Sequence, residues 1–594
     1  MNRRTFIAQA ASLSLAAHEA LTPARCNAAF EAAGPAAGSA RESEPAAGPD
    51  IARYRLTRDR VLHGTAPVYT PEFLLEDVQG GTGRRFTNFS GDLSGRWIGA
   101  LASSARSFGE SFPLLPNVVN RVVAEQHVDG YFGGAFHYDQ PGDDDLALLW
   151  GNGRLLVGLM EYYALAHDPA VLASAKRLGD FLLRIAPRFN SQQMTDAFSA
   201  DHFASSYICW TQQTEGLAAL YAATRDDRYR DLCAAISRRI SRRPGDHVHG
   251  YLTSLRGTLD LHIATGEAAW LNQVIAAWQD VVHSGDLLIT GGVPEGWTPK
   301  KYRTEGCAEC DWLRLNLSLY RATGDPIYLN MAQNTYFNEF SMNQFATGDF
   351  GHGKLNQDGV PEQVIVRAWW CCTLHGLRAF PDLRNSSFRV SGDELFFDFP
   401  IDSRFDSNAI LAQATSNLRN NGEVIIEIHA AQKDQKLTVF KPSWADRVTL
   451  THNGSTASGL VIDKAAAGDI IAVKYHMSLH VEAFGKSSGP ARSLRFGPWL
   501  LGVSSGANPV YFSEMQAQNS FDLSTFHQVP ASSKSIFQVP VANAQMRCKP
   551  AEFPEQPVQV ALVPVAEQTA NPPQMWQLVF PTDPAAGQLE PGAQ

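Results

Sequence analysis

A short pattern that occurs four times along the chain constrains the fold more than any other feature of the sequence. Each copy ends an apolar run with a residue that stops a helix, and an Asp or Glu then favours the start of another helix. The copies occupy residues 163–168, 221–226, 262–267 and 320–325. Because they recur about every 40 to 60 residues, they predict helical hairpins stacked side by side.

The helical pattern extends over residues 56–385, with apolar residues at positions i, i+3, i+4 and i+7. Hairpins of this kind can build an open solenoid or a closed ring, and a segment of this length has room for roughly six of them. We expect a closed (α/α)6 toroid in which the loops at one end surround a cavity.

After residue 385 the pattern changes from helices to strands. Three runs are short, rich in β-branched and aromatic residues, and bounded by Gly, Asn, Asp or Pro, namely 394–399, 423–428 and 469–474. Asn421-Gly422 and Asn453-Gly454 are turn signals. We therefore expect a mainly α protein whose toroid is followed by all-β sandwich domains. The first would cover 386–490, and a second β-rich domain with a poorly ordered tail would cover 491–594.

The N-terminus has the pattern of a twin-arginine export signal, because Arg3-Arg4 precedes the largely apolar run 8–17. We expect residues 1–30 to be this signal. Residues 31–55 are expected to form a disordered linker, since most of this stretch has almost nothing to bury. The apolar run is too short to span a bilayer, and no later stretch reaches the ~18 apolar residues of a membrane helix. The sequence therefore predicts a periplasmic or secreted protein without a membrane span.

Charge argues against a nucleic-acid partner. The formal net charge is -10, the sequence pI is near 5.9, and no basic stripe stands out. Aromatic residues make up 10% of the chain, which suits stacking on sugar rings but suits large cores equally well. Nothing in the sequence indicates the oligomeric state.

Four of the eight cysteines fall in two short clusters, 305–310 and 369–375, beside carboxylates and a histidine. Thiolate sulfur and carboxylate oxygen are good zinc ligands, and a metal lowers the pKa of a thiol enough to keep it as a nucleophilic thiolate. Two alternatives remain open. The cysteines could hold a structural zinc ion, or they could be reduced residues that pack as small hydrophobes.

Several elements together resemble glycoside hydrolase family 127, whose type activity is β-L-arabinofuranosidase. The more specific ones are Glu305-Gly306-Cys307-Ala308 at the start of a helix and Cys371-Cys372 after an aromatic pair. Weaker support comes from three turns or strands, namely Thr290-Gly291-Gly292, Asp129-Gly130-Tyr131-Phe132-Gly133 and Phe496-Gly497-Pro498. The resemblance covers most of residues 120–505.

The resemblance implies an (α/α)6 barrel followed by β-sandwiches and a site that binds Zn²⁺. Carried over to this sequence, the metal ligands would be Glu305, Cys307, Cys371 and Cys372. Cys371 would be the nucleophile of a retaining glycosidase, in which a thiolate replaces the usual carboxylate. The loop that carries the acid of the family is shorter here, and Glu295 is the nearest candidate for that role. A solvated loop carboxylate is the alternative for Glu295.

Four further residues are candidates for the substrate pocket. Trp369 and Arg154 stand where the family has histidines, and His249 matches a pocket histidine. Their alternatives are a core aromatic for Trp369, a solvated helix residue for Arg154 and a satisfied core histidine for His249. His375 could ligate zinc, bond to the sugar or be structural.

Two residues next to the proposed ligands have open roles. Cys310, one helical turn after Cys307, could compete as a ligand. Glu309 could be an acid or accept a hydrogen bond near the metal, or it could lie on a solvated helix face. We interpret the isolated Cys209, Cys233 and Cys548 as packing residues.

The function that these observations predict is a zinc-thiolate-dependent retaining exo-glycoside hydrolase acting on oligosaccharides, with β-L-arabinofuranosides as candidate substrates. One alternative is an (α/α)6 hydrolase or lyase that uses carboxylates and has a structural zinc ion. Another, motivated by Trp369 and Arg154, is a periplasmic carbohydrate-binding protein without catalysis.

Overall fold

The computed structural model describes most of the chain between residues 48 and 508 and short segments beyond. The described residues are 48–64, 68–80, 83–197, 206–297, 303–354, 362–363, 365–483, 491–508, 527–528, 537–540, 559–567, 575–578 and 580–581. The export signal expected over 1–30 lies outside them, as do Cys548 and most of the linker and of the C-terminal tail.

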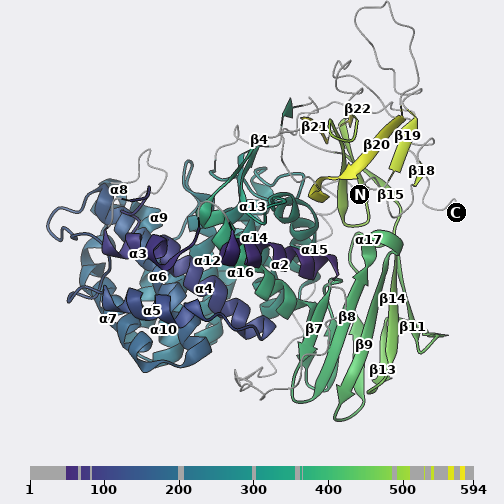
Figure 1. Ribbon diagram of the computed structural model, residues 1–594, viewed down its shortest axis with the longest axis horizontal. Coiled ribbons are helices and arrows are strands. Elements are labelled where there is room, and N and C mark those ends of the chain that lie inside the picture. The colour runs from purple at the N-terminus through teal and green to yellow at the C-terminus, as the bar shows by residue number, and fades with distance from the viewer. Residues whose placement is uncertain are drawn as a thin grey trace, which may run out of the picture.

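Six helices of the described chain form a closed ring in which each contacts the next and the last contacts the first (Figure 1). They are α4 (Asp92–Phe108), α6 (Asp143–Ala166), α10 (Gln213–Thr224), α12 (Val248–Thr265), α14 (Gly306–Thr323) and α16 (Trp370–Ser387). The closed toroid is therefore confirmed, and the open solenoid is excluded.

A second layer of helices packs outside this ring. Each inner helix contacts one of α2 (Pro49–His63), α5 (Leu114–Ala124), α7 (Pro169–Phe189), α11 (Asp227–Ser237), α13 (Ala268–His283) and α15 (Pro326–Thr335). Shorter elements complete the layer, namely α3 (Pro71–Gln79), α8 (Gln192–Ala197), α9 (Ser206–Thr211) and the π-helix η1 (Tyr336–Phe340). None of the described helices has the length and apolar character that crossing a membrane requires.

The four repeated patterns join inner to outer helices, as predicted. The four inner helices that end in this pattern, α6, α10, α12 and α14, each stop at a residue in the left-handed region, with φ of 51°, 56°, 77° and 70° at His167, Arg225, Gly266 and Gly324. In three of the four, the next residue is an aspartate that accepts a hydrogen bond from the first turn of the outer helix, namely Asp168, Asp226 and Asp325. Local chemistry therefore sets these turns.

The backbones of two inner helices, α4 and α6, approach each other closely at glycines. A Cβ on Gly158 would lie 2.3 Å from the carbonyl oxygen of Gly95, and a Cβ on Gly95 would lie 2.5 Å from the Cα of Leu155. Only glycine allows this contact. As a result, both helices are buried on nearly all sides, polar residues included.

The predicted all-β region follows the toroid and begins with two sheets (Figure 1). The six-stranded sheet has the order β12-β11-β14-β9-β8-β7, and the four-stranded sheet has the order β13-β10-β6-β5. Their strands are β5 (Phe388–Ser391), β6 (Glu394–Phe397), β7 (Ser403–Asp406), β8 (Ile410–Asn417), β9 (Glu423–Ala431), β10 (Gln435–Val439), β11 (Arg447–His452), β12 (Ser455–Thr456), β13 (Val461–Ala465) and β14 (Ile470–His476), with the short helix α17 (Leu418–Asn421). The three predicted runs correspond to β6, β9 and β14.

A further sheet combines strands from residue 479 onward with one short strand from the toroid region. It contains β3 (Glu362–Gln363), β15 (Leu479–Ala483), β16 (Ala491–Phe496), β17 (Trp499–Ser504), β18 (His527–Gln528), β19 (Phe537–Pro540), β20 (Gln559–Pro564), β21 (Met575–Gln577) and β22 (Phe580–Pro581), with the 3-10 helix η4 (Val565–Glu567). Strand β15 pairs with β16. The boundary expected between residues 490 and 491 therefore falls between two strands of one sheet.

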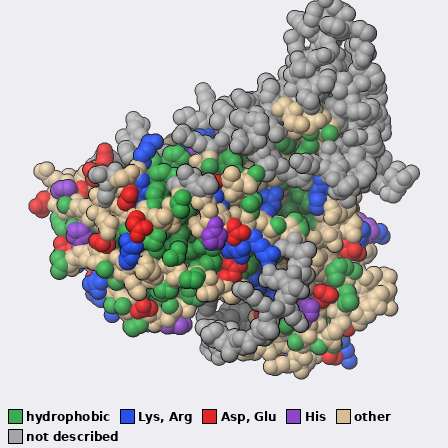
Figure 2. Space-filling view, in the orientation of Figure 1, with side chains coloured by type: hydrophobic (Ala, Val, Ile, Leu, Met, Phe, Trp, Pro, Cys, Tyr) green, Lys and Arg blue, Asp and Glu red, His purple; other side chains and the backbone are tan. Residues whose placement is uncertain are grey.

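Helix α2 begins at Pro49, within the range that we expected for the linker. Asp50 and Asp402 exchange hydrogen bonds, since each backbone N–H donates to the other carboxylate over 3.1 Å. This tertiary contact orders the start of the helix, which composition alone did not indicate. On the face drawn in Figure 2, acidic and basic side chains are interspersed over the toroid.

Candidate active site

A small antiparallel sheet brings the two cysteine clusters together. It contains β1 (Arg303–Glu305), β2 (Gly351–Lys354) and β4 (Ile365–Ala368), in the order β1-β2-β4. Strand β1 leads directly into α14, and β4 leads into α16 after Trp369. Both clusters therefore lie on the first turns of neighbouring helices. The sequence pattern did not predict this sheet, because its strands are short and β1 pairs with β2 across the intervening α14, α15 and η1.

The four predicted metal ligands lie together. The ligand atoms of Glu305, Cys307, Cys371 and Cys372 are all within 4.8 Å of one another. The sulfur atoms of Cys307 and Cys372 are 3.7 Å apart, and the Cys372 sulfur lies 4.0 Å from Oε1 of Glu305. Ligands about 2.3 Å from a tetrahedral zinc ion are separated by about 3.8 Å. The donor set and its spacing therefore fit such an ion.

We call Glu305, Cys307, Cys371 and Cys372 the sulfur cluster. Its three thiols differ in their environment. Cys307 and Cys372 are buried, whereas Cys371 is half-buried. Hydrogen bonds from the Cys307 and Cys372 thiols hold the pKa of Cys371 well below its usual range, and the Arg96 guanidinium acts in the same direction. Burial raises the pKa values of the other two thiols. Cys371 is therefore the most accessible thiol and the one most readily ionised.

Arg96, on α4, is a buried cation beside the cluster that sequence reasoning missed. One guanidinium nitrogen donates to the Cys307 sulfur over 3.5 Å, and another lies 2.9 Å from Nε2 of His249. Its Nε donates to Asp92 over 2.8 Å. Because a guanidinium can only donate, Nε2 of His249 accepts and Nδ1 carries the proton.

His249 and His375 share one carboxylate, and His249 is connected to the sulfur cluster through Arg96. Nδ1 of His249 lies 2.6 Å from Asp311, and Nε2 of His375 lies 2.9 Å from the other oxygen of Asp311. These three residues also have ligand atoms within 4.8 Å of one another. However, Arg256 donates to the same carboxylate over 2.9 Å. Both histidines are fully buried, and their predicted pocket roles stay predictions.

Arg154, on α6, is 2% exposed, so the alternative of a solvated helix residue is wrong. Its guanidinium lies 3.4 Å from the Glu215 carboxylate and donates to the carbonyl oxygen of Gln212 over 3.2 Å. Burial lowers the pKa of Arg154 to about 10. Glu215 also pairs with Arg256 and Arg378, so Arg154 belongs to a buried charge network inside the ring.

Trp369 is the N-cap residue of α16, directly before the paired cysteines. Its ring is half-buried and lies 5.7 Å from the ring of His352 and 6.0 Å from that of Phe86, between centroids. It therefore stands at the edge of the core, next to the small sheet.

Glu295 is 6% exposed, so the alternative of a solvated loop carboxylate is wrong. Its Oε2 accepts from Nε of Arg303 over 2.5 Å, and its Oε1 lies 3.5 Å from Nδ1 of His352. Burial, together with the negative charges of Glu305 and Cys371, raises the pKa of Glu295 to about 7, against the opposing effect of His247 and Arg303. A carboxyl group of this kind can donate and accept a proton near neutral pH.

Two histidines at this site were missed by sequence reasoning. His247, two residues before His249, lies 3.0 Å from Oε2 of Glu305, and although burial opposes it, that carboxylate raises the pKa of His247. His352 pairs with Glu305 across β1 and β2. The short spacing of His247 to His249 was a usable signal, whereas the position of His352 depends on a strand pairing that the sequence does not reveal.

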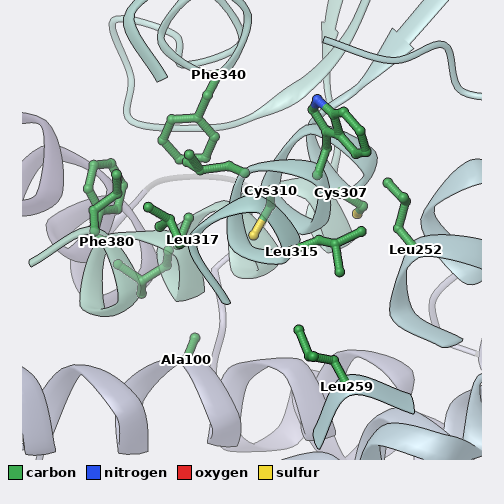
Figure 3. Close-up of a cluster of buried hydrophobic side chains, with 14 of the residues drawn as sticks. Ala100, Leu252, Leu259, Cys307, Cys310, Leu315, Leu317, Phe340 and Phe380 are labelled. Carbon is green, nitrogen blue, oxygen red and sulfur yellow. The ribbon is translucent and has the colours of Figure 1, made fainter. Parts of the chain in front are cut away.

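The residues next to Cys307 point elsewhere. Glu309 is fully buried and accepts a hydrogen bond from the Val293 amide over 3.1 Å, so the alternative of a solvated helix face is wrong. The Cys310 thiol donates to the carbonyl oxygen of His375 over 2.9 Å and is not part of the sulfur cluster. Figure 3 shows Cys307 and Cys310 leaving α14 in different directions. Cys209 and Cys233 are buried, which confirms them as packing residues.

Comparison with known proteins agrees with this architecture. A family model described as the β-L-arabinofuranosidase catalytic domain of glycoside hydrolase family 127 matches residues 75–385, more than half of the chain. The chain belongs to glycoside hydrolase family 127. It is therefore a glycoside hydrolase, and its substrate is a carbohydrate. A search of curated proteins found no match.

Solved structures of this family have the same fold. One is described as a family 127 β-arabinofuranosidase, with a TM-score of 0.63 and 16% identity, over 90% of this chain and 93% of that one. Another is a family 127 β-L-arabinofuranosidase from Geobacillus stearothermophilus T6, with a TM-score of 0.68 and 13% identity, over 90% of this chain and 99% of that one. At these identities the likeness shows the fold alone.

Proposed function

We propose that this family 127 enzyme is a zinc-thiolate-dependent retaining exo-glycoside hydrolase that acts on oligosaccharides with terminal β-L-arabinofuranosyl groups. The observation that carries the proposal is the sulfur cluster: a glutamate and three cysteines, with ligand atoms within 4.8 Å of one another, in a chain of this family. The descriptions of the two similar structures as arabinofuranosidases support the choice of sugar.

Glu305, Cys307, Cys371 and Cys372 would hold the zinc ion, which when bound stabilises the thiolate form of its cysteine ligands. His247 orients Glu305 through the 3.0 Å contact of its Nε2 with Oε2. A histidine in this position fixes a ligand carboxylate in one orientation.

In the first half of the reaction, the Cys371 sulfur attacks the anomeric carbon of the sugar. The bond from that carbon to the leaving oxygen breaks, and the protonated Glu295 gives its proton to this oxygen. The product is a thioglycosyl enzyme on Cys371. The half-buried position of Cys371 and its low pKa support this role, and the raised pKa of Glu295 supports the acid role.

In the second half, the Glu295 carboxylate takes a proton from water while the water oxygen attacks the anomeric carbon. The carbon–sulfur bond breaks, and the Cys371 thiolate is restored. Two inversions at one carbon give net retention. Arg303 and His352 keep the Glu295 carboxyl in place between the two steps.

The sugar would bind on the side of the cluster where Cys371 is accessible. Trp369, half-buried directly before the cysteine pair, offers an aromatic face for the ring. His249, His375 and Arg154 lie deeper, and we propose that they shape the floor of the pocket rather than contact solvent. The N-terminal pattern of Arg3-Arg4 and the run 8–17 supports export to the periplasm or secretion.

The proposal is tested by trapping the intermediate. Incubation with an activated aryl β-L-arabinofuranoside, followed by acid quenching and intact mass spectrometry, should show one added pentosyl group, and peptide mapping should locate it on Cys371. Cys371→Ser should give no adduct. Analysis of oligosaccharide products should show release of single arabinose units. Sugar binding without turnover of any aryl glycoside would instead indicate a carbohydrate-binding protein.

A further inference from the structure

A tight turn directly precedes Glu295 in the chain. The Leu288 amide donates to the Gly292 carbonyl over 2.9 Å, and the Gly291 amide donates to the Leu288 carbonyl over 3.0 Å. Side chains from α14, α15 and β16 donate hydrogen bonds to carbonyl groups of this turn. Thr335 and Trp312 donate to the Gly291 carbonyl over 2.8 and 3.1 Å, and Arg495 donates to the Ile289 carbonyl over 2.6 Å.

Two buried carboxyl groups accept hydrogen bonds from the turn and from the residue that follows it. Oε1 of Glu309 accepts from the Val293 amide over 3.1 Å, and Oε2 of Glu339 accepts from the Thr290 hydroxyl. A Cβ on Gly292 would lie 2.5 Å from Oε2 of Glu309 and 2.4 Å from Cγ of Glu339. The chain therefore passes between two glutamates at a residue that has no side chain.

Glu309 connects the helix that carries Cys307 to the loop that carries Glu295. It lies two residues after Cys307 on α14, and it bonds to the backbone two residues before Glu295. Within the described part of the chain, Glu309 forms no ion pair, and its Oε2 has no hydrogen-bond partner. Burying a carboxyl group in this way is costly, so a packing role alone would be served better by an apolar side chain.

We propose that Glu309 is a positioning residue for the acid Glu295: it ties the loop that carries the acid to the helix that carries Cys307. The proposal rests on the proposed function, in which Glu295 protonates the leaving group. Because Glu309 acts through the backbone at Val293, its removal should displace the acid but leave the sulfur cluster in place.

The leaving group provides the readout. A 4-nitrophenolate departs with little help from an acid, whereas a methoxide must be protonated as it leaves. A misplaced acid therefore slows hydrolysis of a methyl glycoside more than that of a 4-nitrophenyl glycoside. A defect in the nucleophile, in the metal or in the overall fold lowers the rate for both substrates.

The experiment measures kcat/KM for methyl and 4-nitrophenyl β-L-arabinofuranosides and takes their ratio. Relative to wild type, Glu295→Ala should lower the methyl-to-nitrophenyl ratio by about 100-fold or more. Glu309→Leu, which removes the acceptor for the Val293 amide, should lower it by about tenfold. Glu309→Gln keeps an acceptor oxygen and should restore the ratio. Thr258→Val, which removes a buried hydrogen bond to Ser237, should leave the ratio unchanged.

Equal loss on both substrates in Glu309→Leu, or no loss, would overturn the positioning role. If Glu309→Leu does not fold, Gly292→Ala decides the question, because its methyl group pushes the turn away from both glutamates and should lower the same ratio. A normal ratio in Glu295→Ala would instead show that Glu295 is not the acid of the proposed function. Failure of the positioning role and failure of the acid role are therefore distinguishable.

Discussion

Two groups of side chains with the spacing of metal ligands lie next to each other inside the toroid, and they differ in how their charge is balanced. The sulfur cluster contains Glu305 and three cysteines, and the second group contains His249, Asp311 and His375. In both groups the ligand atoms lie within 4.8 Å of one another. Arg96 contacts both, through Cys307 on one side and His249 on the other.

The Asp311 group already has its counter-charges. Arg256 donates to Asp311 over 2.9 Å, and although burial opposes it, His375 and His249 hold the pKa of Asp311 well below its usual range. The sulfur cluster has one carboxylate and three thiols, and among the described residues Arg96 and His247 are the basic side chains that contact it. Closeness of ligand atoms is therefore a weak criterion for a metal site, and the balance of charge distinguishes a site that attracts a cation from one that repels it.

Removing one ligand from each group should give the largest difference between them, measured as zinc retained. Wild-type protein should carry about one zinc ion per chain. Cys372→Ser should bind zinc at least about 100-fold more weakly and lose turnover, whereas Asp311→Asn should keep the ion. Metal analysis after competition with a chelator measures this. Loss of zinc in Asp311→Asn and retention in Cys372→Ser would show that the metal binds at the Asp311 group and not at the sulfur cluster.

The second expected effect of Asp311→Asn is a loss of stability rather than a loss of zinc. The substitution removes a buried negative charge and one of the two carboxylate partners of the Arg256 guanidinium, the other being Glu215, which should cost about 3–5 kcal/mol in the free energy of unfolding. Urea denaturation of the metal-loaded protein measures the cost. Asp227→Asn, at an exposed ion pair with Arg230, is the control and should change stability little. Equal stabilities of Asp311→Asn and wild type would show that the charge network is not a stabilising element.

The contrast between these regions also explains what the sequence could predict. Local signals predicted the hairpin turns, because His167 and Asp168 are adjacent and act within one turn of the backbone. The ligand set came from resemblance to a family, and the structure brings those four residues together.

Long-range pairing and burial account for what was missed. Strand β1 joins β2 through the partners Glu305 and His352, which are distant in the sequence and give no periodic signal. Arg154 and Glu309 were given solvated alternatives because charged residues are usually exposed. Both lie on inner helices that are buried on nearly all sides, where polarity no longer indicates which face meets water.

The smallest expected effect concerns the pH dependence of the acid. Because the pKa of Glu295 is raised to about 7, its protonated form, which the first step needs, is present below that pH and is lost above it. For a methyl glycoside, kcat/KM should therefore fall by about tenfold per pH unit above pH 7. In Glu295→Gln, the residual activity on the 4-nitrophenyl substrate should lack this decline. A decline that persists in Glu295→Gln would show that another group, nearer the sulfur cluster, controls it.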